Sequence, residues 1–174
     1  RPELHLAPRM VDTGAVAADR VHLWALEAAA AWDAFNAIVE WYQADVVAPG
    51  AEDPNFHGLA AQASWFLTGE GRPYNEERAV FDRVLPKANA LKGRGAWEVA
   101  ARWSRIDLDD AGVQGGVQTV WTAGVNWYLN PNIRVQIDHV RAWVRNVGSL
   151  YAFELRFQVD FDLASDELGR IQNF

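Results

Sequence analysis

The sequence predicts an all-β protein, and more specifically an antiparallel segment of a transmembrane β-barrel. Apolar and polar residues alternate with a period of two over most of the second half of the chain, which is typical of strands with one apolar face. The alternating segments are about 11 to 14 residues long, and a tilted strand needs roughly 9 to 11 residues to cross a bilayer. The chain also contains nine Trp residues, and Trp is enriched at membrane–water boundaries.

Four strands are predicted in the second half of the chain, at about 95–107, 117–129, 132–145 and 150–161. The last of these alternates most cleanly, because Phe153, Leu155 and Phe157 point one way while Glu154 and Arg156 point the other. If the apolar faces meet lipid, the polar faces line the interior of the barrel.

Three further strands are predicted from weaker alternation at about 21–31, 34–45 and 56–68. The run from Val21 to Ala31 is rich in Ala, which favours a helix. It has no apolar stripe at helical spacing, so we interpret it as a strand.

The connections between these strands differ in length. Asn130, Pro131 and Asn132 predict a tight turn, and another short turn is expected at 32–34. The segments 45–55, 69–94 and 108–116 are predicted as longer loops, and short turns alternating with longer loops are typical of barrels. Strict up-and-down order places 69–94 at the same end as the short turns, so that segment is either an unusual loop or contains another hairpin.

Composition excludes several classes of protein. The chain has 174 residues, 50% of them hydrophobic, a net charge of −7 and no Cys. It is apolar enough to fold, too acidic for a nucleic-acid footprint, and unable to form disulfides or thiolate metal sites. Charged residues interrupt every apolar stretch of roughly 18 residues, which excludes a transmembrane helix. The first residue is Arg1 rather than Met, which predicts a processed chain or part of a longer one.

Four sequence motifs identify a family resemblance. LTGEGRPYN (67–75), GAWEVAARWSRIDL (95–108), NWYLNPNIR (126–134) and FELRFQVDF (153–161) occur in this order. Together they resemble the C-terminal part of the phosphate-selective porin O and P family of Gram-negative outer membranes. The resemblance covers about 1–161, which we expect to be the C-terminal half of the barrel, with 162–174 as a tail.

The resemblance implies about seven strands of a sixteen-stranded porin that assembles as a homotrimer in outer-membrane lipid. It also implies passive diffusion of small anions such as phosphate or polyphosphate, without a cofactor. The family tends to end on an aromatic residue that signals membrane insertion, and Phe161 occupies that position.

If the apolar faces meet lipid, the alternation pattern points Arg102, Arg134 and Arg156 into the barrel from three neighbouring strands. A guanidinium group is always charged and offers a planar fork of donors, so these side chains are candidate pore-lining contacts for anions. The alternative is that they pair with acids that also face inward, which are Glu98, Asp138, Glu154 and Asp160.

Five Trp residues are predicted on the apolar face near strand ends, where they would form the aromatic girdles at the membrane interfaces. They are Trp97, Trp103, Trp121, Trp127 and Trp143. The alternatives are a buried core between two sheets, or an exposed platform that binds sugar.

These observations favour an outer-membrane porin for small anions over an enzyme. No nucleophile elbow or dinucleotide-binding loop is present. Asp107, Asp109 and Asp110 resemble part of a calcium loop without its downstream Glu, so no metal is expected. A soluble, Trp-rich carbohydrate-binding sandwich and a structural barrel without an open pore remain as alternative functions.

Overall fold

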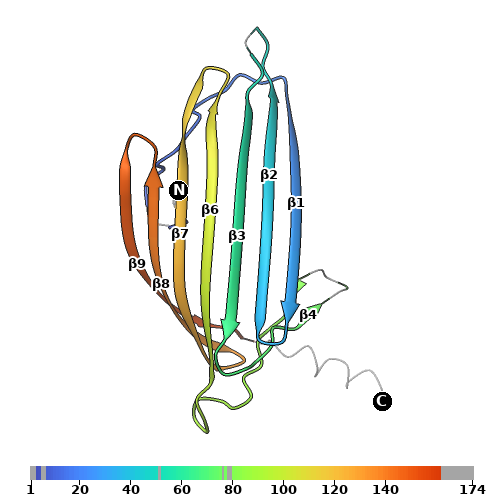
Figure 1. Cartoon of the computed structure of the whole chain (residues 1–174), viewed down its shortest axis with the longest axis vertical. Helices are drawn as coiled ribbons and strands as arrows, with labels where there is room; N and C mark the ends of the chain where they lie inside the picture. The colour runs from blue at the N-terminus through green and yellow to red at the C-terminus, as the bar shows by residue number, and fades with distance from the viewer. Residues whose placement is uncertain (1–2, 5–6, 51, 76, 78–79, 162–174) are drawn as a thin grey trace, which may run out of the picture.

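Seven long strands form one antiparallel sheet in the computed structural model (Figure 1), which describes residues 3–4, 7–50, 52–75, 77 and 80–161. The predicted tail, 162–174, lies outside the described residues. The long strands are β1 (Arg20–Trp32), β2 (Phe35–Val47), β3 (Asn55–Phe66), β6 (Ala96–Asp110), β7 (Val113–Asn130), β8 (Ile133–Val144) and β9 (Gly148–Val159). Two short strands, β4 (Tyr74–Asn75) and β5 (Val80–Phe81), form a separate hairpin.

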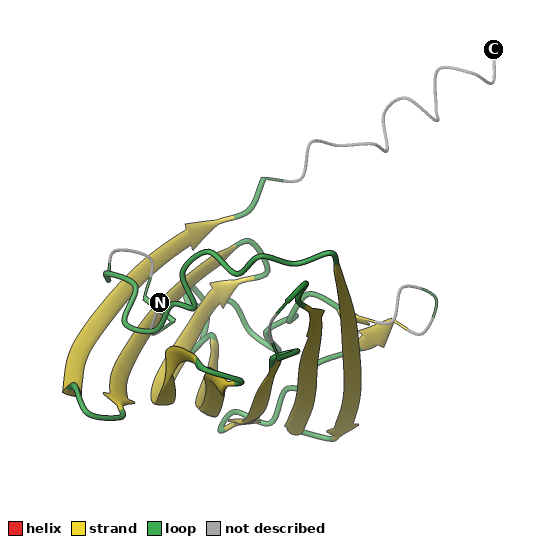
Figure 2. Cartoon of the chain, turned by 90° about the horizontal axis from the view of Figure 1, so that it is seen from above, coloured by secondary structure: helices red, strands yellow, loops and turns green. Residues whose placement is uncertain are grey.

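The sheet is a single curved layer with two open edges (Figure 2). Its strand order is β1-β2-β3-β6-β7-β8-β9, so each long strand lies beside the next one in the chain. β1 and β9 occupy the edges and pair with one strand each. The predicted all-β, antiparallel fold and all seven predicted strands are confirmed. No helix in the described part of the chain is long and apolar enough to span a membrane.

The strand register assigns each side chain to one of two faces. We call the concave side, which carries Glu98, Arg102 and Thr122, the inner face, and the convex side the outer face. The N-terminal segment before β1 lies on the concave side (Figure 2), where the Glu3 carboxylate accepts hydrogen bonds from Arg102, Ser104 and Thr122. Leu4 is buried beside it against Val120, Val140 and Ala142 of the same face.

The prediction of a loop at 108–116 was wrong, because β6 and β7 continue through most of that segment. They are joined by a two-residue turn at Ala111 and Gly112, whose φ angles of 49° and 81° match the turn type that follows the twist of paired strands. We call this end of the sheet the upper end, as in Figure 1. Its connections are therefore not uniformly longer than those at the lower end.

The connection between β3 and β6 contains another hairpin, which was one of the two alternatives left open for this segment. β4 and β5 lie at the lower end with the turns at 33–34 and 131–132 (Figure 1). The connection is tied to the main sheet by backbone hydrogen bonds, including Ala90 N–H to the Leu129 carbonyl at 2.7 Å. It therefore folds against the lower end of the sheet.

The predicted last strand is two residues too long. Val159 is the last residue of β9 because its partner, Ile133, is the first residue of β8. Asp160 donates its backbone N–H to the Asn132 carbonyl at 2.8 Å, and Phe161 follows beyond the ladder with 83% of its surface exposed.

Replacing Gly95 by Ala should destabilise the fold, because Gly95 has a φ of 66° and an added Cβ would lie 2.4 Å from the Tyr128 carbonyl oxygen. We expect about 1–2 kcal/mol from the left-handed backbone and about 2 kcal/mol more from overpacking. Denaturant titration of the full-length protein, followed by Trp fluorescence, measures the loss.

Gly112→Ala is the matched control for this substitution. Gly112 also has a positive φ, but nothing lies within 4 Å of its Cβ position, so only the backbone cost applies. Equal losses for the two variants would show that the close approach of Gly95 to Tyr128 does not matter.

Candidate functional site

The inner face forms a polar wall around a cavity of about 320 Å³. Side chains from β2, β3, β6, β7, β8 and β9 line this cavity, together with Arg72 from the connection between β3 and β4. All three predicted arginines, Arg102, Arg134 and Arg156, line it. They do not lie on adjacent strands throughout, because β7 separates Arg102 on β6 from Arg134 on β8.

Glu98 is the centre of the hydrogen-bond network in this wall. It is only 1% exposed, and its carboxylate accepts hydrogen bonds from Ser64, from Asn126 at 2.9 Å and from the Tyr128 hydroxyl at 2.7 Å. Asn36 extends the network by donating to Ser64 at 2.8 Å. A buried carboxylate is stable only with such donors and a counter-charge.

Arg72 supplies that counter-charge. Its guanidinium nitrogen lies 3.1 and 3.2 Å from the two carboxylate oxygens of Glu98 and also donates to the Tyr128 hydroxyl at 2.9 Å. The contact docks the connection onto the inner face. Strand periodicity could not find Arg72, because it lies in a connection, and its only sequence signal is its place within the motif at 67–75.

Arg102 forms ion pairs, but not with the acids that the sequence suggested. Its side chain lies 3.0 Å from Glu3 of the N-terminal segment and 3.5 Å from Glu40 of β2, and it donates to Gln62 at 3.0 Å. Glu98, one of the expected partners, is taken by Arg72. Two carboxylates therefore offset the charge of Arg102.

Arg134 and Arg156 keep more of their charge available. Arg134 donates to the Gln158 amide oxygen at 2.7 Å and to the Tyr128 hydroxyl at 3.3 Å, both of which are neutral. Its guanidinium also lies 5.5 Å from the centre of the Tyr128 ring. Arg156 forms no hydrogen bond or ion pair with any residue that the structure describes, and it lines a further cavity of about 620 Å³.

Acidic side chains share this second cavity with Arg156. Glu3, Asp138 and Glu154 line it, so the charge on this part of the wall is mixed. Asp138 lies directly over β7 because residue 124 is Gly, and a Cβ there would be 1.9 Å from an Asp138 carboxylate oxygen. Asp138 accepts a hydrogen bond from the Gln136 amide at 2.6 Å.

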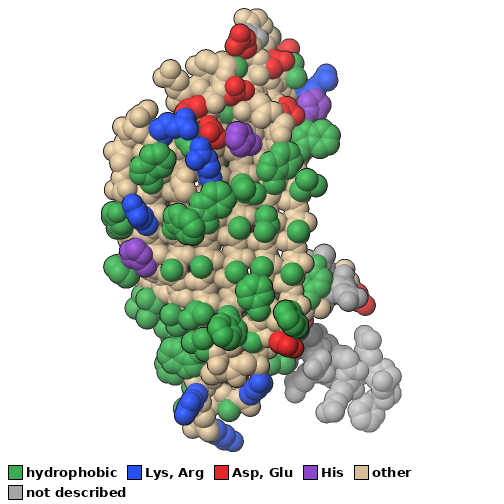
Figure 3. Space-filling view, in the orientation of Figure 1, with side chains coloured by type: hydrophobic (Ala, Val, Ile, Leu, Met, Phe, Trp, Pro, Cys, Tyr) green, Lys and Arg blue, Asp and Glu red, His purple; other side chains and the backbone are tan. Residues whose placement is uncertain are grey.

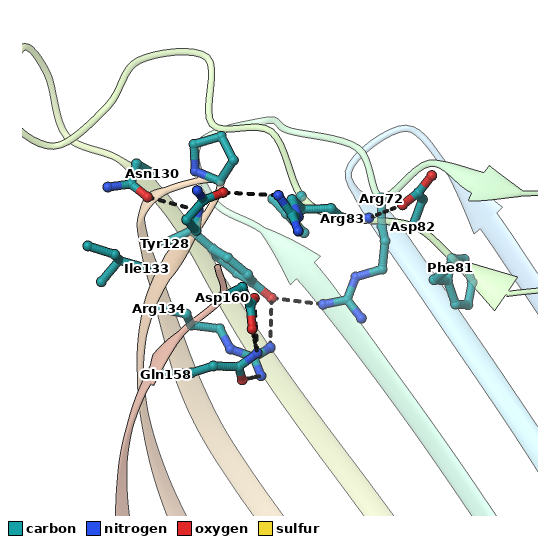
Figure 4. Close-up of a pocket in the computed structure, with 13 residues that line it drawn as sticks. Arg72, Phe81, Asp82, Arg83, Tyr128, Asn130, Ile133, Arg134, Gln158 and Asp160 are labelled. Atoms are coloured by element: carbon teal, nitrogen blue, oxygen red, sulfur yellow. Dashed lines mark hydrogen bonds between the residues drawn. The ribbon is translucent and has the colours of Figure 1, made fainter. Parts of the chain in front are cut away.

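A third cavity of about 220 Å³ opens at the lower end (Figure 4). Arg72 and Arg134 line both this cavity and the 320 Å³ cavity above it, so the two cavities share these arginines. Arg83 adds a third guanidinium and donates to the Asn132 side chain at 3.0 Å. Asp82 and Asp160 contribute negative charge to the same lining.

The N-terminal segment also carries a locally stabilised acid above the inner face. Asp12 accepts a hydrogen bond from the Gly14 N–H at 3.0 Å and pairs with Arg9 at 3.0 Å. These two contacts, in that order of importance, lower the pKa of Asp12 below its usual value. The backbone N–H of Asp12 donates to the Gly115 carbonyl at 2.8 Å, which holds the segment against β7.

All nine Trp residues fall on the outer face by strand register. Figure 3 shows hydrophobic side chains over the middle and lower parts of this face, with many charged ones toward its upper end. Trp97 and Trp127 stack at 5.2 Å near the lower end, and both indole N–H groups donate to the Arg94 carbonyl. Trp121 is 58% exposed, and the sheet is a single layer, so the Trp residues do not form a buried sandwich core.

The expectation that the five singled-out Trp residues lie near strand ends was only partly right. Trp97, Trp127 and Trp143 do, but Trp103 and Trp121 face each other in the middle of β6 and β7, with ring centres 6.4 Å apart. The reason is that β6 and β7 continue well beyond this pair toward the upper end.

The acidic turn at 107–112 is held by contacts within the protein. Asp107 pairs with Arg105 at 3.6 Å and Asp109 with Arg145 at 3.5 Å, while Asp110 accepts the Asn55 backbone N–H at 2.7 Å. Within the described ranges, no group of three or more His, Cys, Asp or Glu side chains is arranged to hold a metal ion.

Comparison with known proteins connects this geometry to a family. The sequence model of the family described as "Phosphate-selective porin O and P" matches residues 1–161. Porin O of Pseudomonas aeruginosa is 33% identical over 131 residues, which are 69% of this chain and 29% of that protein. A protein of Caulobacter vibrioides described as uncharacterized is 31% identical over 142 residues, which are 80% of this chain and 28% of that protein. The chain thus spans less than a third of the length of these two curated relatives.

Removing the charge of Glu98 should destabilise the inner wall, because Arg72 would lose its counter-charge in a largely buried site. We expect Glu98→Gln to lower the free energy of unfolding by about 3 kcal/mol. Glu40→Gln is the control, because Arg102 would keep its contact with Glu3, and we expect a loss below about 1 kcal/mol.

A double variant tests the pairing itself. Arg72→Gln combined with Glu98→Gln should cost less than the sum of the two single variants, since no unpaired charge remains. Denaturant titrations of the unmodified protein, the two single variants and the double variant measure this coupling, and strict additivity would show that Arg72 and Glu98 do not stabilise each other.

Proposed function

This chain belongs to the phosphate-selective porin O and P family, and we propose that it forms part of the wall of an outer-membrane pore for small anions such as phosphate. The observation that carries the proposal is the division of one curved sheet into two faces. Nine Trp residues lie on the convex face, and the concave face carries arginines around cavities that share part of their lining. This is the arrangement that a channel in a bilayer requires.

We propose that further strands complete the barrel by pairing with β1 and β9. Both edge strands are long, at 13 and 12 residues, and each has one side without a partner in the described sheet. Such edges are normally paired or blunted in stable proteins. An aqueous pore needs about 16 to 18 strands, which agrees with the sixteen that the family resemblance implies. Assembly as a homotrimer in a Gram-negative outer membrane belongs to the same proposal.

The arginines of the inner face provide a path of weak anion contacts. Guanidinium groups bind oxyanions through parallel N–H donors, and conduction requires several sites that each release the ion readily. Arg156 lines the 620 Å³ cavity, and Arg134 lines both the 320 Å³ and the 220 Å³ cavities. The solute gradient drives the passage, and no cofactor takes part in the proposed mechanism.

The aromatic side chains of the outer face would anchor the barrel in the membrane. Trp97 and Trp127 form one row near the lower end, while Trp103, Trp121 and Trp143 lie further up. Phe161, just beyond β9, would act as the insertion signal that the resemblance implies.

A structural barrel with a filled lumen is a second candidate. Two segments cover the inner face, which are the N-terminal segment at Glu3 and Leu4 and the connection at Arg72. Together they reduce the space beside β6 and β7. The first candidate predicts an open pore despite these segments, and the second predicts none.

Planar-bilayer recording under a KCl gradient separates the two candidates. Natively extracted, full-length protein should show single-channel steps and a reversal potential of the sign expected for anion selectivity. Absence of current from folded, membrane-derived protein would favour the filled barrel, and a cation-selective current would assign selectivity to the acids of the wall.

Selectivity should depend unequally on the three predicted arginines. We expect Arg156→Ser to reduce the anion preference most, Arg134→Ser less and Arg102→Ser least, because Glu3 and Glu40 already offset Arg102. The triple variant should lose most of the preference. Reversal potentials measure each effect.

Arg105→Ser is the matched control for this series, since Arg105 lies on the outer face and pairs with Asp107. Its reversal potential should equal that of the unmodified protein. An unchanged preference in the triple variant would remove these arginines from the conduction path.

A further inference from the structure

The upper part of the outer face contains a cation among exposed aromatic side chains. Arg141 of β8 lies between Trp121 of β7 and Tyr151 of β9 in the strand register. Trp143 follows on the same strand and the same face, one step further up. We call these four residues the Arg141 patch. All four side chains are exposed, and they point away from the proposed pore because they lie on the outer face.

Arg141 differs from Arg105 and Arg145, two other arginines toward this end of the outer face. Arg105 pairs with Asp107 and Arg145 with Asp109. Arg141 forms no ion pair with any residue in the described ranges, and its protein contact is with the Tyr151 ring, whose centre lies 5.5 Å from the guanidinium carbon. Its donors are therefore directed to the surroundings of the protein.

The aromatic neighbours also offer donors without protein acceptors. At the lower end, the indole N–H groups of Trp97 and Trp127 are both satisfied by the Arg94 carbonyl. The N–H groups of Trp121 and Trp143 and the hydroxyl of Tyr151 have no hydrogen-bond partner in the part of the chain that the structure describes. The two ends of the apolar band thus differ in chemistry.

The position of the Arg141 patch fits the boundary of the hydrocarbon layer. Directly above the Arg141 row the outer face becomes charged, because Arg105 lies in the next row, beside Thr119 and Trp143, and Asp107 lies in the row after that. An arginine on the lipid face of a barrel costs about 2–4 kcal/mol at the midplane but only about 0–1 kcal/mol near the interface. Arg141 is thus placed where a guanidinium is tolerated and where lipid phosphates lie.

We propose that the Arg141 patch binds the phosphate group of a membrane lipid. The guanidinium would hold two phosphate oxygens, and the indole N–H of Trp121 and the hydroxyl of Tyr151 would donate to the remaining acceptors. The lipid chains would then run down the apolar side chains below. This inference rests on the proposed membrane location but not on anion conduction.

A lipid phosphate fits this patch better than a second copy of the chain. The patch is positively charged and rich in donors, so its partner must supply acceptors. The acids on the upper outer face are already engaged, since Asp45 accepts from Trp24 and Gln43, and Asp107 pairs with Arg105. A copy of this face would therefore offer Arg141 only carboxylates, such as Asp45 and Asp107, that already have partners within their own chain, whereas a phosphate brings several charged oxygens.

Native mass spectrometry of the full-length protein in detergent tests the proposal. Phosphatidic acid and diacylglycerol with identical chains are the two probes, because they differ only in the phosphate. The unmodified protein should retain phosphatidic acid and not diacylglycerol. Arg141→Gln should weaken retention about tenfold, as expected for the loss of one charged hydrogen-bonding group. Trp121→Phe, which keeps a ring but removes the N–H, should weaken it less.

Arg145→Gln is the matched control, because it removes a nearby cation that Asp109 already pairs. It should retain phosphatidic acid like the unmodified protein. Equal retention by Arg141→Gln, or equal loss in Arg145→Gln, would overturn the proposal. Displacement of the lipid by millimolar inorganic phosphate would reassign the patch to free phosphate, and dissociation of an oligomer by Arg141→Gln with unchanged lipid retention would reassign it to a contact between protomers.

Discussion

The alternation of side chains along a β-strand divides this sheet into two faces, and every other feature of the structure depends on that division. Because neighbouring strands are in register, a row of residues that is apolar on one strand stays apolar across the sheet. All nine Trp residues reach the convex face in this way. The concave face receives the groups that need water or charged partners, with Glu98 at their centre.

The inner wall shows how charge is distributed between structure and function. Glu98 and Arg72 neutralise each other, so their role is to hold the connection between β3 and β6 against the sheet. Arg102 is similarly offset by carboxylates from two other segments. Arg156 has no such partner among the described residues, so its charge is not offset on the concave side of the sheet. A count of inward-facing arginines and acids could not distinguish these cases, because the pairing depends on which segments cross the wall.

Three predictions about where strands end were wrong, because local composition and alternation do not determine the length of a strand. The segment 108–116 is rich in acids and Gly, as loops are, but Ala111 and Gly112 supply a turn tight enough for the strands to continue. Trp103 and Trp121 lie at mid-strand for the same reason. Phe161 continues the alternation of β9, yet it lies outside the strand because β8 offers no partner beyond Ile133. In the first two cases the tight turn at Ala111 and Gly112 determined the outcome, and in the third the extent of the partner strand did.

The sequence by itself determined the fold class, the seven strands, and the face on which each predicted Arg and Trp lies, because a period of two is a property of the local backbone. Its motifs also indicated the family, which the comparison with known proteins established. Only the tertiary structure decided that Arg72 pairs with Glu98, that Glu3 reaches Arg102, and that Arg141 remains unpaired among the described residues. The contact between Glu3 and Arg102 joins residues 99 positions apart. Arg72 and Glu3 lie in segments outside the long strands, and these segments have no periodicity from which their paths could be inferred.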